Sequence, residues 1–226
     1  MAGLIPPHGK SQLNSLIASE AAHSDALTRA EQLRKIPMSS REVSDLLMLG
    51  MGAYTPLTGF MGEADWRGCC LDMKTADGLF WPIPITLSCE SDLASGIAVG
   101  EEVALVDDTG TIFGTLEVTE KYTIDKAFEC AHVYSTTDVA HAGVEKVMQQ
   151  GAINLAGPVI VLNEGDYSEK YPGLYYRPAE TRALFQTQGW NTVAAFQTRN
   201  PMHRSHEYLA KIAVEICDGL LIHQVL

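Results

Sequence analysis

The stretch from Val193 to Glu207 constrains the fold more than any other part of the chain. Four apolar residues, Val193 to Phe196, predict a buried strand, and a run of polar residues follows at once. After Pro201, apolar residues recur with helical spacing as far as Ile216. A strand therefore passes into a helix through a polar turn. In open α/β sheets this junction lies at the carboxyl edge, where ligands bind, and the N-terminus of the helix suits phosphate.

Helix and strand alternate on both sides of this junction. A helix is predicted over residues 179–188 and ends at Gly189, and a further strand is predicted over 219–223. With the strand at 193–196 and the helix that begins at His203, the order is α-β-α-β. Such an order implies a parallel sheet.

The preceding region, from Trp81 to Val161, has the pattern of short strands separated by turns. Residues 82–87 alternate in polarity but include two prolines, which suits an edge strand. The predicted elements that follow are a hairpin of 103–106 and 112–118 around the turn 107–110, a helix over 143–150 and a strand over 158–162. Regularly spaced short strands favour a small, partly closed barrel. The expected fold class is thus α+β for a first domain (1–167) and α/β for a second (168–226).

The N-terminal region contains two predicted helices and a loop. Leu27 and Leu33 indicate a short helix that ends near Pro37. Ser39 and Glu42 form a capping box for a second helix. Residues 52–61 contain too much glycine and proline for a regular element, so we expect a packed loop.

Composition limits the possible partners and compartment. The formal net charge of −12 over 226 residues argues against a nucleic-acid partner, because general phosphate binding requires an excess of Lys and Arg. The five cysteines include no CxxC pair, which favours reduced thiols in the cytoplasm. No window of the sequence is long and apolar enough for a membrane helix. A bound anion must therefore be captured by a local cluster of donors.

Such a cluster is present in the turn and in the first turn of the predicted helix. Its members are Gln197, Thr198, Arg199, Asn200, His203 and His206. Arg199 offers a planar fork of donors for a tetrahedral oxyanion, and Gln197 and Asn200 add neutral donors. His203 and His206 are three residues apart and share one side of the helix. These groups can stabilise charge on transferring phosphoryl oxygens, which is most of what nucleotidyl transfer requires of a protein.

Each of these residues also has a simpler interpretation. Two histidines at this spacing could ligate a metal, but no third ligand stands at an obvious spacing in the sequence. Arg199 alone could form a surface ion pair. The crowding of all six residues into ten positions favours an anion site over both alternatives.

The ten residues from Gln197 to His206 (Gln-Thr-Arg-Asn-Pro-Met-His-Arg-Ser-His) resemble the signature of ATP sulfurylase, or sulfate adenylyltransferase, which makes adenylyl sulfate and pyrophosphate from ATP and sulfate. Other stretches similar to the family are residues 7–9, 52–60, 81–86, 165–167 and 178–182. The resemblance implies a PUA-like β-barrel domain followed by the beginning of a Rossmann-like nucleotidyltransferase domain of the HxGH type.

The resemblance also implies roles for the six residues. Thr198, Arg199, Asn200, His203 and His206 would be catalytic, Gln197 and Arg199 would bind sulfate, and all six would bind ATP. MgATP would be a substrate, with Mg²⁺ held through the nucleotide and no metal bound tightly by the protein itself. The expected partners are ATP, sulfate, pyrophosphate and adenylyl sulfate, in a homo-oligomer that binds neither nucleic acid nor membrane.

The sequence also departs from the family pattern. A later Gly-Arg-Asp-His-Ala-Gly motif does not occur in it, and Gln224 stands where a proline usually follows the histidine. Ala142 likewise replaces a common proline. We therefore expect a fragment of a longer enzyme with little or no activity alone. Two alternatives stay open: another HxGH-type adenylyltransferase, and a noncatalytic binding or assembly module that retains the signature as a remnant.

Overall fold

The computed structural model describes residues 3–224, so the extreme ends of both expected domains, residues 1–2 and 225–226, lie outside the described residues. The elements follow in the order α1 (Glu20–Glu31), β1 (Lys35–Pro37), α2 (Ser40–Gly50), β2 (Gly59–Phe60), α3 (Glu63–Asp72), β3 (Leu87–Cys89), α4 (Ser91–Ser95), β4 (Glu102–Val106), β5 (Ile112–Glu117), β6 (Glu120–Thr123), α5 (Lys126–Val133), α6 (Ala142–Met148), β7 (Ile153–Val161), α7 (Tyr167–Lys170), α8 (Pro178–Thr187), β8 (Val193–Thr198), α9 (Arg204–Ile216) and β9 (Gly219–Gln224). No helix in this part of the chain has both the length and the apolar character needed to cross a bilayer.

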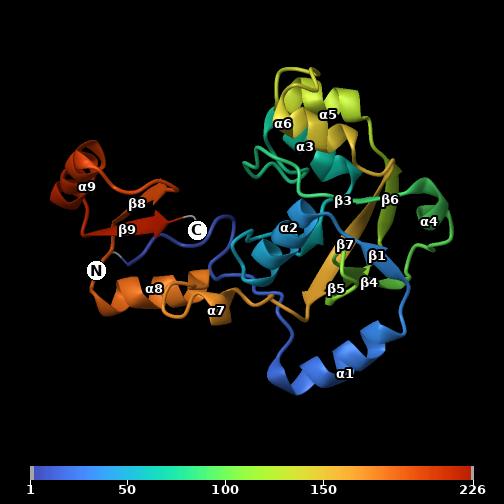
Figure 1. The fold of residues 1–226 in the computed structure, drawn as a ribbon, viewed down its shortest axis with the longest axis horizontal. Helices are drawn as coiled ribbons and strands as arrows, with labels where there is room; N and C mark the ends of the chain where they lie inside the picture. Colours follow the sequence, from blue (N-terminus) through green and yellow to red (C-terminus); the bar gives the residue numbers. More distant parts are fainter. Residues whose placement is uncertain (1–2, 225–226) are drawn as a thin grey trace.

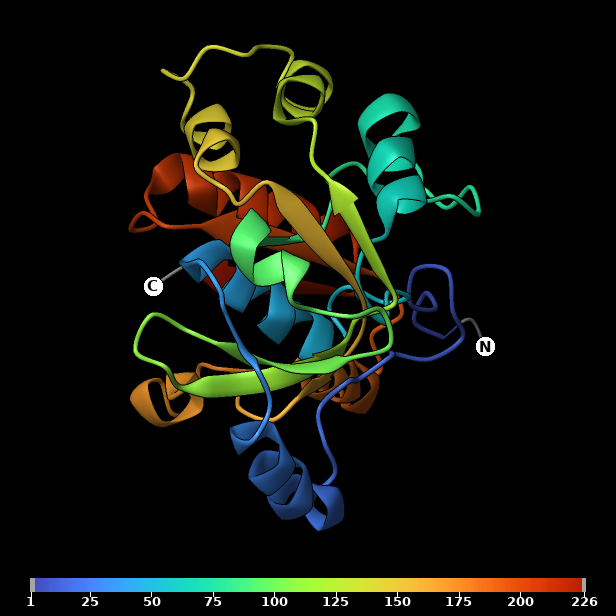
Figure 2. The ribbon, with the colours of Figure 1, turned by 90° about the vertical axis from the view of Figure 1, so that its right-hand side faces the viewer.

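Strand β7 organises the larger sheet. Its first half pairs antiparallel with β3 and β6, and its second half pairs antiparallel with β5 and β2. Between the halves, Gly157 has φ +147°, and a Cβ atom there would lie 2.0 Å from the carbonyl oxygen of Glu117. Only glycine fits this position, and its conformation lets the strand bend. In Figure 2, β4 and β5 accordingly run across the direction of β6 and β7.

Helices cover this sheet on two sides. Helix α1 packs through Ala30 against Ala104 of β4, whereas α3 packs through Trp66 and Cys70 against Tyr122 of β6. Figure 1 shows α1 on one side of the sheet and α3, α5 and α6 on the other, with α2 between them. The main apolar core lies among α2 and β1, β3, β4, β5 and β7. The N-terminal body is thus a mixed, curled sheet with its own core, an α+β arrangement.

Glu42 ties helix α2 to strand β3. The side chain is 2 % exposed, and its carboxylate accepts hydrogen bonds from the N–H and hydroxyl of Ser39 at 2.8 and 2.7 Å. It also accepts from the N–H and hydroxyl of Ser88 at 2.7 and 2.8 Å. The capping box predicted from Ser39 and Glu42 is confirmed. Because four donors surround the carboxylate, its burial is compensated.

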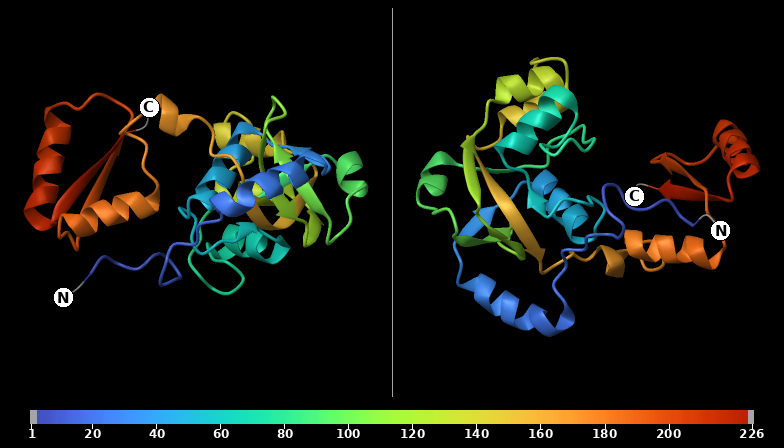
Figure 3. Two further views of the ribbon diagram at one scale, coloured as in Figure 1. Left: turned by 90° about the horizontal axis from the view of Figure 1, so that it is seen from below. Right: turned by 180° about the vertical axis from the view of Figure 1, so that it is seen from behind.

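The C-terminal elements form a smaller unit around two parallel strands. Strands β8 and β9 pair in parallel, as predicted, and α8 and α9 flank them. Figures 1 and 3 show this unit as a separate lobe beside the larger body. Several apolar side chains of α9 remain exposed, among them Tyr208 (67 %), Leu209 (52 %) and Ile216 (76 %). The two-stranded sheet therefore leaves the apolar face of α9 partly uncovered.

Asp218 fixes the register of this parallel pair. Its carboxylate accepts hydrogen bonds from the backbone N–H groups of Asn191 and Thr192 at 2.9 Å and from the Thr192 hydroxyl at 3.0 Å. These bonds lower the pKa of Asp218. Next to it, a Cβ atom on Gly219 would lie 2.1 Å from the Trp190 ring, so the start of β9 admits only glycine. The start of β8 is thereby held beside the start of β9.

Some expected elements differ from the structure. Residues 82–86 form no strand, and β3 begins only at Leu87. Pro82 and Pro84 lack the N–H donors that a strand ladder requires. The carbonyl of Ile85 accepts a hydrogen bond from the Met61 N–H at 2.9 Å and is not part of a strand ladder. The first helix ends at Glu31 and not near Pro37, which lies in β1. The hairpin of β4 and β5 and helix α6 are confirmed. The loop expected over 52–61 is irregular only as far as Thr58, because Gly59–Phe60 pairs with β7, and the strand expected over 158–162 begins earlier, at Ile153.

Asp45 is a buried acid on α2. It is 8 % exposed, accepts a hydrogen bond from the Tyr54 hydroxyl at 3.1 Å, and lies 4.0 Å from the Arg41 guanidinium. Burial raises the pKa of Asp45 to about 6, although Arg41 and Tyr54 oppose the shift. The folded protein therefore binds a proton at Asp45 more tightly than the unfolded chain does.

We predict that Asp218→Ala loosens the C-terminal unit. Three hydrogen bonds to the carboxylate are lost, and the register of β8 on β9 is no longer held at its start. Amide hydrogen exchange followed by NMR should become severalfold faster at residues 193–198 and unchanged in β7. Asp108→Ala, at an exposed aspartate in the β4–β5 turn, serves as the control. Equal exchange rates in the two variants would contradict the assigned role.

We predict that Asp45 makes the protein less stable as pH rises. Because its folded-state pKa lies above the unfolded value, its contribution favours the fold at low pH and is lost between about pH 4 and 6. The free energy of unfolding of the wild type, minus that of Asp45→Asn, should fall by about 2 kcal/mol from pH 4 to pH 7 in urea titrations. The exposed Asp25→Asn should show no such trend. A difference that rises with pH would refute the assignment.

Candidate functional site

The polar turn after β8 is closed by Thr198. Its side chain is buried, and its hydroxyl donates to the Asn200 carbonyl at 3.0 Å and lies 3.1 Å from the Asn200 N–H, which can donate to it. Pro201 follows and disfavours helical backbone at Asn200. These features end the strand at Thr198 and separate it from helix α9. Thr198 therefore shapes the turn from inside, while the next two residues, Arg199 and Asn200, are exposed.

His203 and His206 lie together at the start of α9. Their ring centroids are 3.9 Å apart and the rings are inclined by 32°. His203 is the N-cap residue, and its backbone N–H donates to Nδ1 of His206 at 3.4 Å. A neutral His206 that accepts at Nδ1 must carry its proton on Nε2, which leaves one N–H to donate. The Phe196 ring, 5.4 Å away, borders the pair on the strand side.

Gln197 lies beside a residue of the neighbouring strand. In the register of β8 and β9 it is directly opposite His223, and Nε2 of Gln197 lies 3.5 Å from Nδ1 of His223. Both side chains are exposed. The carboxyl ends of the two parallel strands thus bring a carboxamide and an imidazole to one edge of the sheet.

Arg199 projects from the same turn with its donors free. It is exposed, and within residues 3–224 its side chain makes no ion pair or hydrogen bond. The structure therefore brings together His203 with His206, Thr198 with Asn200, and Gln197 with His223. It records no contact between Arg199 and any of these residues. The six predicted residues nevertheless share one strand-to-helix junction, and the N-terminus of the 13-residue helix α9 opens toward it.

The groups at this junction are all suited to binding a negatively charged ligand. They comprise a guanidinium, two carboxamides, two imidazoles and the first-turn N–H groups of a helix. Each is a hydrogen-bond donor in at least one orientation or protonation state. Within the described residues, no group of three or more His, Cys, Asp or Glu side chains is arranged to hold a metal ion.

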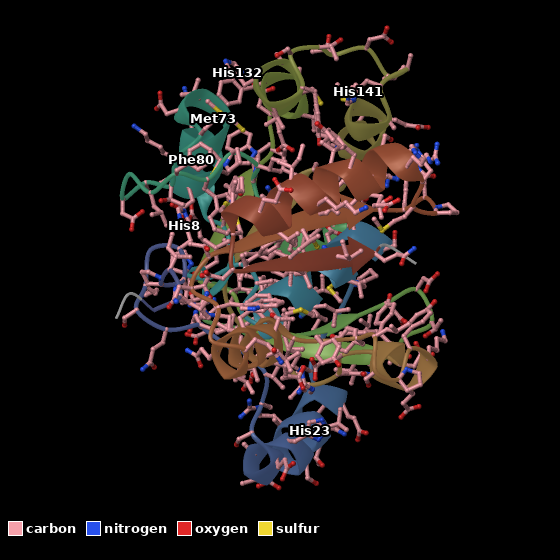
Figure 4. The ribbon with its side chains drawn as sticks, turned by 90° about the vertical axis from the view of Figure 1, so that its left-hand side faces the viewer. His8, His23, Met73, Phe80, His132 and His141 are labelled. Carbon is pink, nitrogen blue, oxygen red and sulfur yellow. The ribbon has the colours of Figure 1, made fainter. Side chains whose placement is uncertain are left out.

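A cavity of about 420 Å³ lies elsewhere, in the N-terminal body. Its lining includes Ser39, Arg41 and Glu42 from the start of α2 and Lys146 and Gln150 near α6. None of the six residues at the strand-to-helix junction lines it. Figure 4 shows that His8, Met73 and Phe80 come from a further surface of this body, where His8 Nε2 lies 2.8 Å from the Phe80 carbonyl oxygen.

All six residues of the predicted cluster follow a predicted strand in the sequence, but His223 was not predicted as a site residue. One signal in the sequence could have identified it. His223 ends the next predicted strand, and in a parallel sheet the carboxyl ends of neighbouring strands meet at one edge. The register that sets it opposite Gln197 depends on Asp218, which no sequence motif marks.

Two family models match the chain. Residues 5–164 match the family described as PUA-like domain, and residues 172–226 match the family described as ATP-sulfurylase. The first match includes the whole curled sheet, and the second includes β8, α9 and β9.

Individual proteins show the same similarity. A sulfate adenylyltransferase of Chlorobaculum tepidum is 57 % identical over 225 residues, which are 99 % of this chain and 56 % of that protein. One from Psychrobacter sp. (strain PRwf-1) is 55 % identical over 99 % of this chain and 54 % of that protein. The chain spans about half the length of these relatives. A solved structure titled hexameric APS kinase from Thiobacillus denitrificans superposes with a TM-score of 0.76 at 29 % identity, over 98 % of this chain and 40 % of that chain.

The resemblance to the sulfate adenylyltransferases expected from the ten-residue signature is thus confirmed along nearly the entire chain. Because residues 5–164, well over half of the chain, match one family model, the chain belongs to the PUA-like domain family and continues into a segment that matches the ATP-sulfurylase family.

Proposed function

We propose that the chain forms part of a sulfate adenylyltransferase, which converts ATP and sulfate into adenylyl sulfate and pyrophosphate. The observation that carries this proposal is the set of donors at the β8–α9 junction, with His203 and His206 side by side at 3.9 Å. The similarity to enzymes of that name supports it, and the activity is proposed for the whole enzyme. We also propose the domain boundary near residues 167 and 168 and a Rossmann-like nucleotidyltransferase identity for the second domain, supported by the parallel pairing of β8 and β9.

The proposed reaction requires positioning and charge stabilisation. An oxygen of sulfate attacks the α-phosphorus of ATP, the bond from this phosphorus to the bridging oxygen breaks, and pyrophosphate leaves with the electron pair. No side-chain nucleophile is needed. Mg²⁺ enters as part of the substrate MgATP, bound through the nucleotide.

Each of the six residues has a proposed part in this step. Arg199 and Gln197 bind sulfate through the guanidinium fork and the carboxamide. Thr198 and Asn200 shape the turn that receives ATP, and their mutual hydrogen bonds support this role. His203 and His206 donate to phosphoryl oxygens as charge develops on them, which is where preorganised donors lower the barrier most.

The assembly and compartment are also proposed. We propose a homo-oligomer, supported by the structural match to a protein titled hexameric. A cytoplasmic location is supported by the five free cysteines, four of which are buried. An assembly role without catalysis is a second candidate function, favoured by the same match to a protein titled hexameric.

We predict that Arg199→Ala weakens the binding of MgATP and sulfate to the chain by about tenfold or more, because a charge-assisted pair of hydrogen bonds is lost. His203→Ala should weaken MgATP binding severalfold. Isothermal titration calorimetry with MgATP, with and without sulfate, provides the measurement. Arg204→Ala is a matched control, because it removes an equal charge from the adjacent, exposed first turn of α9.

The outcomes separate the candidate functions. Equal effects of Arg199→Ala and Arg204→Ala would refute a specific site, and wild-type protein that binds neither ligand would favour the assembly role. Pyrophosphate release from MgATP that depends on an organic acceptor, and not on sulfate, would indicate another adenylyltransferase. For residues 1–226 alone we expect little sulfate-dependent release, since within the described residues the C-terminal unit forms a two-stranded sheet that leaves the apolar face of α9 partly uncovered.

A further inference from the structure

We propose that His223 is a positioning residue that orients the carboxamide of Gln197 toward the bound anion. The inference rests on the proposed function, because Gln197 is the residue proposed to contact sulfate and ATP. His223 lies opposite Gln197 in the parallel register, and Nδ1 of His223 is 3.5 Å from Nε2 of Gln197.

The strand geometry explains why these two side chains meet. Side chains alternate between the two faces of a strand, and directly opposite residues of paired strands lie on the same face. Thr198, the next residue along β8, is buried, whereas Gln197 is exposed on the other face. His223 shares that exposed face with Gln197. Gln224 is opposite Thr198 and therefore belongs to the other face.

The chemistry of the carboxamide gives this contact a consequence. A carboxamide has one accepting oxygen and one donating nitrogen, and a half-turn about its last bond exchanges them. An anion can be bound only by the nitrogen. Because Nε2 of Gln197 faces Nδ1 of His223, an imidazole that carries its proton on Nε2 accepts one N–H of the carboxamide at Nδ1 and leaves the second N–H free for the anion.

Without His223, the carboxamide has no partner that distinguishes its two ends. Among the described residues, the contact with His223 is the only hydrogen bond that the Gln197 side chain makes. Half of the carboxamide orientations would then present the oxygen to the anion, and this oxygen, with its partial negative charge, would repel the anion. His223 acts through Gln197 and does not itself touch the substrate, so its effect should disappear when Gln197 is removed.

The first test needs no ligand. In NMR spectra of the isotopically labelled full chain, His223 should carry its proton on Nε2, and the side-chain N–H signals of Gln197 should shift in His223→Ala. His223→Asn, whose amide oxygen reaches near the Nδ1 position and can accept in its place, should restore them. Gln224→Ala, on the opposite face of the same strand, is the control and should leave them unchanged. Identical Gln197 signals in the wild type and His223→Ala would overturn the proposal.

The second test measures sulfate binding in a double-mutant cycle. His223→Ala should weaken sulfate binding by about three- to tenfold, the range expected for one hydrogen bond. His223→Asn should retain most of the affinity, and His223→Ala should have no further effect in the Gln197→Ala background. Additive effects of the two alanine substitutions would overturn the positioning role.

The binding and NMR measurements distinguish the positioning role of His223 from the proposed function. A wild-type chain that binds no sulfate and no MgATP contradicts the proposed function, while the NMR signals of Gln197 still decide the contact with His223. Sulfate binding that is equal in the wild type and in His223→Ala contradicts the positioning role and leaves the proposed function intact. Thermal unfolding of each variant shows whether the β8–β9 pair has been lost, and His223→Asn provides the comparison if His223→Ala does not fold.

Discussion

The register between β8 and β9 is the constraint on which the candidate site depends. Six consecutive residue pairs are fixed by it, from Val193 with Gly219 to Thr198 with Gln224. A slip of one residue would turn every side chain of one strand to the opposite face. Asp218 and the close contact of Trp190 with Gly219 hold the start of the pair, so the functional end is positioned by contacts about six residues away. Exposed polar contacts can therefore determine the geometry of the junction without being part of it.

The two parts of the chain achieve order by different means. The N-terminal body surrounds a large apolar core, and its buried carboxylate Glu42 is satisfied by four donors. In the C-terminal unit, neither α8 nor α9 contains a buried residue. This unit is held together by the pairing of β8 with β9, the hydrogen bonds to Asp218 and the stacked rings of Phe185 and Trp190. A hydrogen bond to an anion is also weaker where water competes, so the donors at the junction gain strength when the surrounding surface is covered.

The sequence predicted those elements whose signal is local. Ser39 and Glu42 specify a helix start through two reciprocal hydrogen bonds, and the alternation of helix and strand after residue 178 specifies a parallel pair. Elements set by distant contacts were missed or misplaced. Residues 82–86 alternate like a strand, but Ile85 bonds to Met61. Helix α3 escaped notice because it contains Gly68, a residue of poor helix propensity, and two cysteines that pack against the sheet only in the folded protein.

In the candidate site, too, the local features were predicted and the long-range contacts were not. The sequence predicted that six donor residues lie at one strand-to-helix junction, because their spacing alone places them there. It did not predict their contacts, since the neighbour of Gln197 comes from another strand, 26 residues later. The pairing of His203 with His206 depends on a further local detail, the N-cap position of His203, which turns its N–H toward the second imidazole. A pattern in the sequence therefore predicts which groups lie at the junction but not how each is oriented.

The acidic balance of the chain bears on how such a site could bind ATP. A net charge of −12 opposes the approach of a polyanion at long range, but salt screens charges beyond a Debye length of about 8 Å at physiological ionic strength. Within that range, the charges of nearby side chains determine whether an anion is attracted to the site. The carboxylate in the first turn of α9 belongs to Glu207, and Lys211 neutralises it through a contact of 2.6 Å that lowers the pKa of the acid. Arg199 is left as an uncompensated cation at the junction, since its side chain makes no ion pair within residues 3–224. An acidic protein can thus hold a strongly anionic substrate, provided that it keeps its carboxylates paired where that substrate is bound.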